Sequence, residues 1–266
     1  MLRIVVCVKA VPDPRKADRI CIDPVTKSLP RMDIPLVVNP LDRNALEVAL
    51  QQKERSGAHI AVISMGPPPA GEMVKECLAL GADEGVLLSD PAFAGADTLA
   101  TACTLAKAIE KVGAVDVVLC GRASSDSSTE WVGPELATFL HLPVITMVRE
   151  FVETEGARWR VKADLEQGYR LVEVELPAVF TVTQGVNQPR PLGFSGIINA
   201  RKKPITTWGL QDLGVSEEVV GLRGSPTIVA ELSRVKTTRI CHIVQGTLDE
   251  KAEFVVAQLV RAGVLR

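Results

Sequence analysis

The sequence predicts an α/β protein with a doubly wound, mostly parallel sheet, helices on both faces, an antiparallel excursion and a long C-terminal arm. Three observations predict this fold class. In the first half, four short apolar runs rich in β-branched residues alternate with segments of helical periodicity, which is typical of a parallel sheet covered on both faces. After Pro143 apolar and polar residues alternate, which indicates antiparallel strands. From Gln184 onward the chain is rich in Gly, Pro and Asn, which indicates an irregular arm.

In the first half of the sequence, capping residues and glycines mark where the expected helices start and stop. The expected strands are IVVCV (4–8), IAVISM (60–65), GVLL (85–88) and VDVVLC (115–120). The first expected helix, LDRNALEVALQQKERS, carries Asp42 near its start to complement the helix dipole and stops before Gly57. Helices are also expected in AGEMVKECLALGA and in DTLATACTLAKAIEKV, which opens with Asp97 or Thr98 as a cap and closes at Gly113. Right-handed crossovers between the strands then place helices on both faces of the sheet.

The second half adds an antiparallel segment, an arm and a terminal helix. Residues 144–183 form the antiparallel segment, and their last apolar run, AVFTV, is expected to rejoin the sheet. We therefore expect an α/β domain over 1–183, an extended arm over 184–215 and a C-terminal segment over 216–266. That segment ends in an amphipathic helix, whose apolar stripe must be buried against another surface. The stripe consists of Ala252, Val255, Val256, Leu259 and Val260.

Composition excludes several classes of protein. The chain has 266 residues, a net charge of −2 and 47% hydrophobic residues, which suits an ordinary globular protein with one large core or two smaller ones. A near-neutral charge argues against binding to nucleic acid or to a membrane surface. The apolar run at the N-terminus is too short to span a membrane, and no small-residue cleavage site follows it. A cytoplasmic location is therefore expected.

Nothing in the residue spacing predicts a metal site or a catalytic site. The six cysteines are scattered singly, without a CxxC pair, and we expect four of them to be buried, reduced thiols. These four are Cys7, Cys77, Cys103 and Cys120. The three histidines are isolated, and none has a nearby partner that suggests a nucleophile or a general base. The sequence therefore favours a binding protein over a hydrolase.

Three polar clusters follow expected strands, and the carboxyl ends of such strands are where doubly wound sheets bind ligands. The clusters are Lys9 to Asp13, Ser64 to Gly66, and GRASSDSSTEWVGPELA (121–137). The third offers backbone N–H groups, small residues and several hydroxyls, which together suit a phosphate. The hydroxyls belong to Ser124, Ser125, Ser127, Ser128 and Thr129. It has neither a Walker lysine nor a GxGxxG pattern, so two interpretations stay open: a phosphate cradle, or a loop, Asp126 included, that only caps a helix.

Five segments together resemble the β subunit of electron transfer flavoproteins. They are VCVKAVPD (6–13), NPLDRNALEVAL (39–50), ALGADEGVLL (79–88), GRASSDSSTEWVGPELA (121–137) and LPAVFTVTQGVNQPRPLGFSGIINARKKPI (176–205), in the family's order. The resemblance implies a heterodimer with an α subunit, whose C-terminal domain holds a redox-active FAD near the β subunit. It also implies an adenine nucleotide in the β subunit itself. That nucleotide is AMP in most members and a second FAD, which takes hydride from NADH, in electron-bifurcating members.

By motif position, the resemblance implies a set of nucleotide contacts and a docking arm. The nucleotide contacts are Cys7, Asn39, Pro40, Leu41, Asp42, Met65, Gly121, Arg122, Ala123, Ser124, Ser125, Asp126, Ser127, Ser128, Thr129, Glu130, Trp131 and Val132. The arm resembles the family's recognition loop, which docks on acyl-CoA dehydrogenase partners. Phe194 occupies the anchor position, flanked by Leu192 and Ile197. The alternative is that Phe194 folds back into the protein's own core.

The chain departs from the family pattern in the serine-rich segment. Many members have an acidic or amide-bearing run in place of SSDSSTEW, and Trp131 replaces a residue that is usually small or an amide. VGPE and NPLD are similar to the bifurcating branch, but Ser127 and Ser128 replace its usual glycine and acid. The choice between AMP and FAD therefore stays open.

The expected function is electron transfer between dehydrogenases and an acceptor oxidoreductase. The flavin supplies the redox reactivity and the chain positions it, so no catalytic residue is assigned. Oxidoreductase activity with NADH, that is, NADH-driven bifurcation, is expected only if the second FAD is present. One alternative is a free-standing adenine-nucleotide sensor of the same architecture, although such proteins tend to be half this length and have a glycine-rich phosphate loop. Another is a hydrolase of the nucleotide α-phosphate that uses Asp126.

Overall fold

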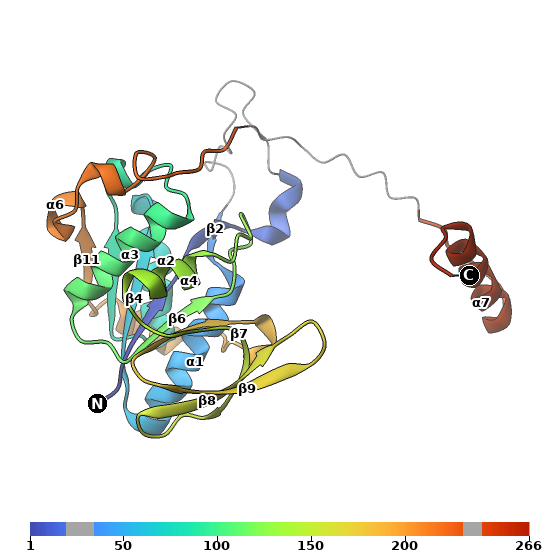
Figure 1. Cartoon of the computed structure of the whole chain (residues 1–266), viewed down its shortest axis with the longest axis horizontal. Helices are drawn as coiled ribbons and strands as arrows, with labels where there is room; N and C mark the ends of the chain where they lie inside the picture. The colour runs from blue at the N-terminus through green and yellow to red at the C-terminus, as the bar shows by residue number, and fades with distance from the viewer. Residues whose placement is uncertain (20–34, 231–240, 266) are drawn as a thin grey trace. The chain divides into compact units, whose positions relative to one another are not determined.

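A nine-stranded sheet forms the centre of the larger of two units (Figure 1). The computed structural model describes residues 1–19, 35–230 and 241–265, and the chain divides into the units Met1–Glu231 and Leu232–Arg266. The strands of the sheet are β1 (Arg3–Cys7), β4 (His59–Met65), β5 (Glu84–Leu88), β6 (Val117–Gly121), β7 (Val144–Glu153), β8 (Arg158–Asp164), β9 (Tyr169–Glu175), β10 (Ala178–Val182) and β11 (Ile205–Trp208). A separate antiparallel pair consists of β2 (Ala10–Pro12) and β3 (Leu36–Val38).

The order of the strands is β11-β5-β4-β1-β6-β10-β7-β8-β9. Neighbours from β11 to β7 pair in parallel, whereas β7, β8 and β9 pair antiparallel. From β1 the chain builds outward through β4 and β5, and it then returns to place β6 on the other side of β1. The strand order therefore reverses between β1 and β6, which is the position where sheets of this type bind ligands.

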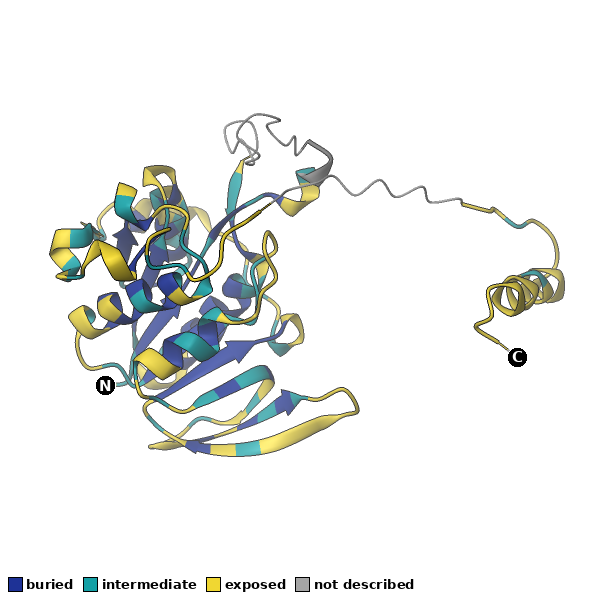
Figure 2. Cartoon of the chain, turned by 45° about the horizontal axis from the view of Figure 1, so that its top comes forward, coloured by how far each residue is buried: buried dark blue, intermediate teal, exposed yellow. Residues whose placement is uncertain are grey.

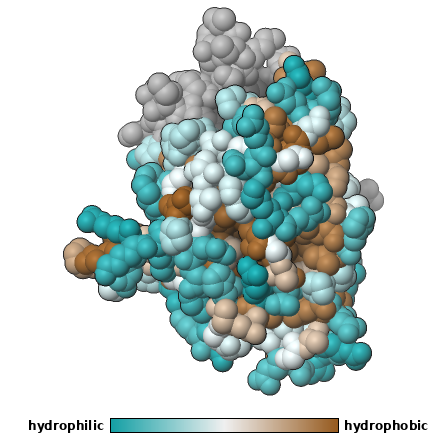
Figure 3. All heavy atoms as spheres, turned by 90° about the vertical axis from the view of Figure 1, so that its left-hand side faces the viewer, coloured by the Kyte–Doolittle hydropathy of each residue, from teal (hydrophilic) through white to brown (hydrophobic). Residues whose placement is uncertain are grey.

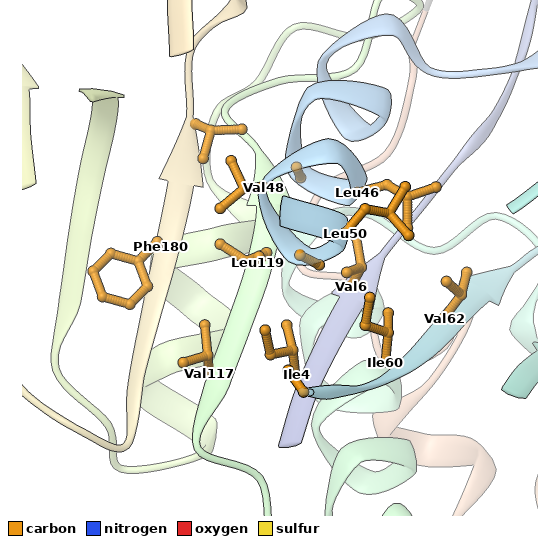
Figure 4. Close-up of a cluster of buried hydrophobic side chains, with 14 of the residues drawn as sticks. Ile4, Val6, Leu46, Val48, Leu50, Ile60, Val62, Val117, Leu119 and Phe180 are labelled. Atoms are coloured by element: carbon orange, nitrogen blue, oxygen red, sulfur yellow. The ribbon is translucent and has the colours of Figure 1, made fainter. Parts of the chain in front are cut away.

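Helices cover both faces of the parallel part of the sheet. On one face α1 (Pro40–Ser56) and α2 (Gly71–Leu80) pack against alternate strand residues such as Ile4 and Leu119, and Figure 4 shows this cluster. On the other face α3 (Thr98–Val112) and α4 (Val132–Phe139) pack against the intervening residues, such as Val5 and Val118. Because successive strand residues point to opposite faces, both clusters are built from the same strands. The predicted doubly wound fold is confirmed.

The helix signals in the sequence act as expected. Gly57 ends α1 in the left-handed conformation, with φ 69°, and Gly113 follows α3. The Asp97 side chain caps α3 by accepting a hydrogen bond from the backbone N–H of Ala100. Helix α1 begins with Pro40 at its first position. The N–H that proline lacks would have had no partner within the helix there, so no hydrogen bond is lost.

Residues 184–215 contain more regular structure than the sequence patterns predict. Along the chain, helix α5 (Phe194–Ala200) precedes β11 and helix α6 (Leu210–Leu213) follows it. Strand β11 pairs in parallel with β5 and forms one edge of the sheet. Its four residues, ITTW, are too few to show a periodicity, so only the pairing with a distant strand makes them recognisable.

The smaller unit contains α7 (Leu248–Arg261), which begins with a capping box between Thr247 and Glu250. The whole predicted apolar stripe is exposed or nearly so, and no residue of α7 is buried (Figure 2). On the side of the larger unit where α6 and β11 lie, hydrophilic residues make up much of the surface, with hydrophobic residues between them (Figure 3). Within the described ranges, no helix is both long and apolar enough to cross a membrane.

Candidate functional site

A buried carboxylate joins the two strands between which the order reverses. Asp42 lies in the first turn of α1, and its Oδ2 accepts a hydrogen bond of 2.8 Å from the backbone N–H of Lys9, just after β1. Its Oδ1 accepts a bond of 3.1 Å from the backbone N–H of Gly121, the last residue of β6. A Cβ at Gly121 would lie 2.5 Å from the same Oδ1 and 2.7 Å from Cβ of Leu41. The close approach of helix and strand therefore requires glycine here.

The environment of Asp42 favours its neutral form. Burial raises the pKa of Asp42 to about 7, although hydrogen bonds from Asn39 and from the backbone N–H groups of Lys9 and Gly121 act in the opposite direction. Near neutral pH this carboxyl group is therefore close to half ionised. Its charge state at the strand ends changes within the physiological range of pH.

Asn39 fastens the segment after β6 to the start of α1. It is the N-cap residue of α1, yet its side chain makes no capping bond. Instead its Nδ2 donates to the carbonyl oxygen of Ala123 at 2.9 Å, and its Oδ1 accepts from the backbone N–H of Ser125 at 3.1 Å. Asn39 is only 1% exposed, so both bonds are shielded from water. The amide fixes the backbone of residues 122–131, which we call the serine loop.

The serine loop folds back on itself and keeps its hydroxyls near the surface. The backbone N–H and the Oγ of Ser128 both donate to the carbonyl oxygen of Ser124, at 2.9 and 3.2 Å. The hydroxyls of Ser124 and Ser127 lie 2.7 Å apart. Ser128 and Glu130 adopt positive φ values of 50° and 64°, which are uncommon for residues other than glycine. Strained backbone of this kind is often found at functional sites.

Lys9 brings a positive charge to the serine loop. Its Nζ lies 2.7 Å from Oδ1 of Asp126, and it donates to Oγ of Ser124 at 3.3 Å and to Oγ of Ser127 at 3.5 Å. Lys9 is absent from the predicted set of nucleotide contacts, although it belongs to the polar cluster that follows β1. In the sequence, only the position of Lys9 directly after the first strand indicates that it belongs to the site.

The hydroxyls of the serine loop take part in bonds other than a cap at the N-cap residue of the next helix. Helix α4 begins at Val132, and the side chain of its N-cap residue, Trp131, makes no capping bond. The hydroxyls instead bond to one another, to the loop backbone and to Lys9.

A cleft of about 740 Å³ opens beside the serine loop. Nine of the predicted nucleotide contacts line it, namely Asn39, Pro40, Leu41, Arg122, Ala123, Ser124, Ser125, Ser128 and Glu130. The remaining wall comes from residues that the sequence patterns did not single out: Pro14, Met147, Arg149, Asp164, Thr183, Gln184 and Gly185. Most of that wall lies within β7, at the end of β8 and just after β10, which reach the site only because β10 pairs between β6 and β7.

Two arginines place positive charge in the cleft. Arg122 lies 3.1 Å from Glu130, and Arg149 lies 3.1 Å from Asp164. All four side chains are partly exposed, so these ion pairs contribute little to stability and their charges stay available to a ligand. Between them Met147 adopts a positive φ of 61° at a bulge in β7, and its backbone N–H donates to Oγ1 of Thr181 at 3.2 Å.

Some predicted contacts lie away from the cleft. Cys7, Met65 and Val132 belong to the apolar cluster beneath α3 and α4. Cys7 is buried there together with Cys120, whereas Cys77 is buried in the cluster on the other face of the sheet. Cys103 is half-buried, and Cys21 lies outside the described residues. Trp131 is 63% exposed and does not line the cleft. The structure therefore brings the N-terminus of α1 and the serine loop together, whereas Cys7 and Met65 do not line the cleft beside them.

The residues of the cleft fit a nucleotide. The volume lies within the range of about 300–1,000 Å³ that is usual for cofactor sites. Hydroxyls and two guanidinium groups line the cleft, and Lys9, which does not line it, binds the hydroxyl of Ser124 in its wall. Together these groups supply donors and positive charge for a phosphate. Asp126 and Glu130 contribute negative charge, but each is paired with a cation.

Residues 192–197, which follow the cleft residues 183–185 along the chain, carry an exposed apolar surface. Phe194 is 80% exposed at the start of α5, and Leu192 and Ile197 are each 41% exposed. We call these three residues the docking patch. The alternative in which Phe194 folds into the core is therefore wrong.

Comparisons with known proteins agree with these features. The sequence pattern of the family described as "Electron transfer flavoprotein domain" matches residues 29–213. The chain is 46% identical over 229 residues to the caffeyl-CoA reductase-Etf complex subunit CarD of Acetobacterium woodii, covering 86% of each chain. It is 44% identical over 259 residues to the electron transfer flavoprotein subunit beta of Thermoanaerobacterium thermosaccharolyticum, covering 97% of this chain and 98% of that one. It is 35% identical over 271 residues to the acryloyl-CoA reductase electron transfer subunit gamma of Anaerotignum propionicum, covering 99% and 100%.

Proposed function

The chain belongs to the electron transfer flavoprotein family, and on this premise we propose that it is the β subunit of a heterodimer that passes electrons between a dehydrogenase and an acceptor oxidoreductase. In this role it binds an adenine nucleotide, either AMP or a second FAD, at the serine loop. The observation that carries the proposal is the convergence of Lys9 and the loop hydroxyls at the reversal of strand order. The donors of this loop suit a phosphate group.

The residues of the site have separate tasks in this proposal. Lys9 and the hydroxyls of Ser124 and Ser127 bind the phosphate, while Asn39 and Asp42 hold the loop and the strand ends in place. The flavin supplies the one- and two-electron chemistry when it is bound. The chain binds and orients, and none of its residues transfers a proton in the reaction.

The α subunit is the partner that the smaller unit would bind. Helix α7 has an apolar stripe that is not buried within the smaller unit, and a stripe of that kind is stable only when it is packed. The similarity to the flavoprotein β subunit covers 97% of the chain and so extends into this segment. We therefore assign α7 to the interface with the α subunit.

An acyl-CoA dehydrogenase or a related reductase is the electron-transfer partner in this proposal. Two relatives are named as subunits that serve a caffeyl-CoA reductase and an acryloyl-CoA reductase. The docking patch offers such a partner one aromatic anchor with two aliphatic neighbours, a small apolar surface of the kind that dominates binding energy in interfaces. A free-standing nucleotide sensor would use neither this patch nor the stripe of α7.

Co-expression with the α subunit tests the proposal. The two chains should purify as a stable heterodimer whose visible spectrum shows bound flavin. A stable heterodimer without flavin, or a chain that stays a nucleotide-responsive homodimer with no affinity for an α subunit, would reject it. In the second case the sensor alternative would be favoured.

A further inference from the structure

One helix holds both the serine loop and the segment that leads to the docking patch. The N-terminal turn of α1 carries Asn39 and Asp42, which bind the strand ends and the loop. Asn44 and Glu47, one turn further along, bind residues 187–190 instead. The spacing of three residues places Asn44 and Glu47 on the same face of the helix.

Glu47 and Arg190 form a half-buried ion pair with two parallel hydrogen bonds. Arg190 Nε donates to Oε2 of Glu47 at 2.8 Å and Nη2 donates to Oε1 at 2.9 Å, while the backbone N–H of Arg190 adds a bond of 3.2 Å to Oε2. The Glu47 side chain is only 6% exposed and that of Arg190 is 32% exposed, so the carboxylate is shielded from water while the guanidinium group keeps one side in solvent. Burial alone would raise the pKa of Glu47, but the hydrogen bonds from Arg190 outweigh it and hold the pKa below its ordinary value. We call this pair the Arg190 fork.

A second polar contact acts beside the fork. Asn44 Nδ2 donates to Oδ1 and to the carbonyl oxygen of Asn187, at 2.9 and 3.0 Å, and Asn187 Nδ2 donates to the carbonyl oxygen of Asn44 at 3.0 Å. Prolines stand on both sides of Arg190 and restrict the backbone there to extended conformations. The backbone that enters the docking patch is therefore fixed by side-chain bonds and by its own stiffness.

The other end of the patch is fixed on α2. A Cβ at Gly196 would lie 2.1 Å from the carbonyl oxygen of Ala79, so α5 packs directly on the backbone of α2. Lys203, just after α5, donates to the carbonyl oxygens of Leu78 and Ala82 at 3.0 and 2.5 Å. Phe194 thus projects into solvent from a segment that is held on both sides.

We infer that Glu47 and Arg190 are positioning residues that hold the docking patch in its binding-competent orientation before a partner arrives. The inference rests on the proposed function of the patch. A preorganised surface loses less conformational entropy on binding than a mobile one, so its affinity for a partner is higher. Loss of the fork should weaken encounter with the partner and leave electron transfer within the complex unchanged.

The matched pair Glu47→Gln and Glu54→Gln tests this inference. Both glutamates lie on α1 and both bind Arg190, the latter through Nη1 at 2.6 Å, but Glu54 is 61% exposed. Each variant removes one negative charge and keeps the shape of the side chain. In hydrogen exchange on the full chain, Glu47→Gln should speed amide exchange in residues 187–200 by about tenfold, while Glu54→Gln and the core strands stay as in the wild type. Equal exchange in Glu47→Gln and wild type would overturn the inference.

A kinetic measurement checks the consequence for docking. With the heterodimer and an acyl-CoA dehydrogenase as electron donor, Glu47→Gln should raise the KM for the dehydrogenase about tenfold with kcat unchanged. Arg190→Lys keeps the charge but cannot bind both oxygens of Glu47, so it should reproduce the effect if Glu47→Gln folds poorly. If Glu47→Gln speeds amide exchange in residues 187–200 but leaves the KM for the dehydrogenase unchanged, the inference is overturned.

Phe194→Ala separates this inference from the proposed function. If Phe194→Ala raises KM and the Glu47 variant does not, the fork has no positioning role and the docking assignment stands. If Phe194→Ala leaves KM unchanged, the patch is not the docking surface, and the inference falls with that assignment.

Discussion

At the residue scale, three buried or half-buried polar side chains organise the site. Asp42 joins the ends of β1 and β6, Asn39 fixes the serine loop, and Lys9 brings positive charge to its hydroxyls. Each bond connects segments far apart in the sequence, so the loss of one side chain should change the geometry of the loop without removing a helix or a strand. Two substitutions follow from this.

Asp42→Asn should change how stability depends on pH. The pKa of Asp42 rises from its ordinary value of 3.8 to about 7 in the folded chain, so the folded state holds this proton more tightly than the unfolded state. The contribution of Asp42 to the free energy of unfolding is therefore most favourable below the ordinary pKa. This contribution falls as pH rises toward 7, by about 4 kcal/mol at most. Urea unfolding between pH 4 and 8 should show a shallower decline in Asp42→Asn, which at low pH is less stable by about 1–3 kcal/mol because one backbone N–H loses its acceptor.

Asp90→Asn is the control for this pH experiment. Asp90 also accepts two backbone hydrogen bonds, from Leu210 and Ala92, each of 2.9 Å. These bonds lower its pKa, so its contribution is present above the ordinary value and is lost only as pH falls below it. Between pH 5 and 8 the variant should keep the slope of the wild type. An unchanged slope in Asp42→Asn would contradict the account of that residue.

Lys9→Gln should reduce the amount of nucleotide that copurifies with the heterodimer. The substitution removes the positive charge beside Ser124 and Ser127, which we expect to weaken phosphate binding about tenfold. Because a ligand that binds only the folded state stabilises it, the melting temperature should also fall. Lys75→Gln, on the exposed surface of α2, removes the same charge elsewhere and should retain the nucleotide. Equal nucleotide content in the two variants would rule out the role of Lys9.

At the element scale, the docking patch and α7 both carry exposed apolar side chains, which we assign to different partners. The patch lies on the larger unit, between two points of attachment to α1 and α2. Helix α7 lies in the smaller unit and has its own capping box. Substitutions in the two elements should therefore affect different binding steps.

Phe194→Ala should leave folding and nucleotide content intact and weaken electron transfer from a dehydrogenase. The side chain is 80% exposed, so its removal should change the free energy of unfolding by only about 0.5 kcal/mol or less. The rate of transfer at low dehydrogenase concentration is the measurement. Tyr169→Ala removes another exposed aromatic ring, on β9, and should transfer at the wild-type rate. Equal rates for Phe194→Ala and wild type would remove Phe194 from the interface.

Val256→Asp should weaken assembly with the α subunit. It places a charge in the middle of the apolar stripe of α7, where burial against a partner would require the charge to lose its hydration. Gln258→Asp adds a charge to the same helix outside the stripe and should assemble normally. Sedimentation of each variant with the α subunit gives the dissociation constant. If both variants assemble with the affinity of the wild type, α7 is not part of the interface.

The elements that could be predicted from the sequence are those with a local signal. Apolar periodicity sufficed for β1, β4, β6 and β10, and Gly57 and Asp97 marked helix ends correctly. Strand β11 has no such signal, because its four residues become a strand only by pairing with β5. The wall of the cleft formed by Met147 and Arg149 was missed for a similar reason, since it depends on the non-sequential order of β6, β10 and β7.

At the scale of the whole molecule, the reversal of strand order explains why the site lies where it does. β1 and β6 are paired neighbours, but the helices that follow them, α1 and α4, pack on opposite faces of the sheet, which leaves an opening at the carboxyl ends of the two strands. Helix α1 also binds, through Glu47, the segment that leads to the docking patch. A single helix therefore supports both the serine loop and the docking patch.

The most direct test of this account is acid extraction of the purified heterodimer, followed by chromatographic separation of AMP and FAD. The account predicts that the wild-type heterodimer releases FAD from the α subunit together with a second adenine nucleotide, AMP or FAD, and that Lys9→Gln loses only the second. A wild-type heterodimer that releases neither flavin nor any adenine nucleotide would contradict it.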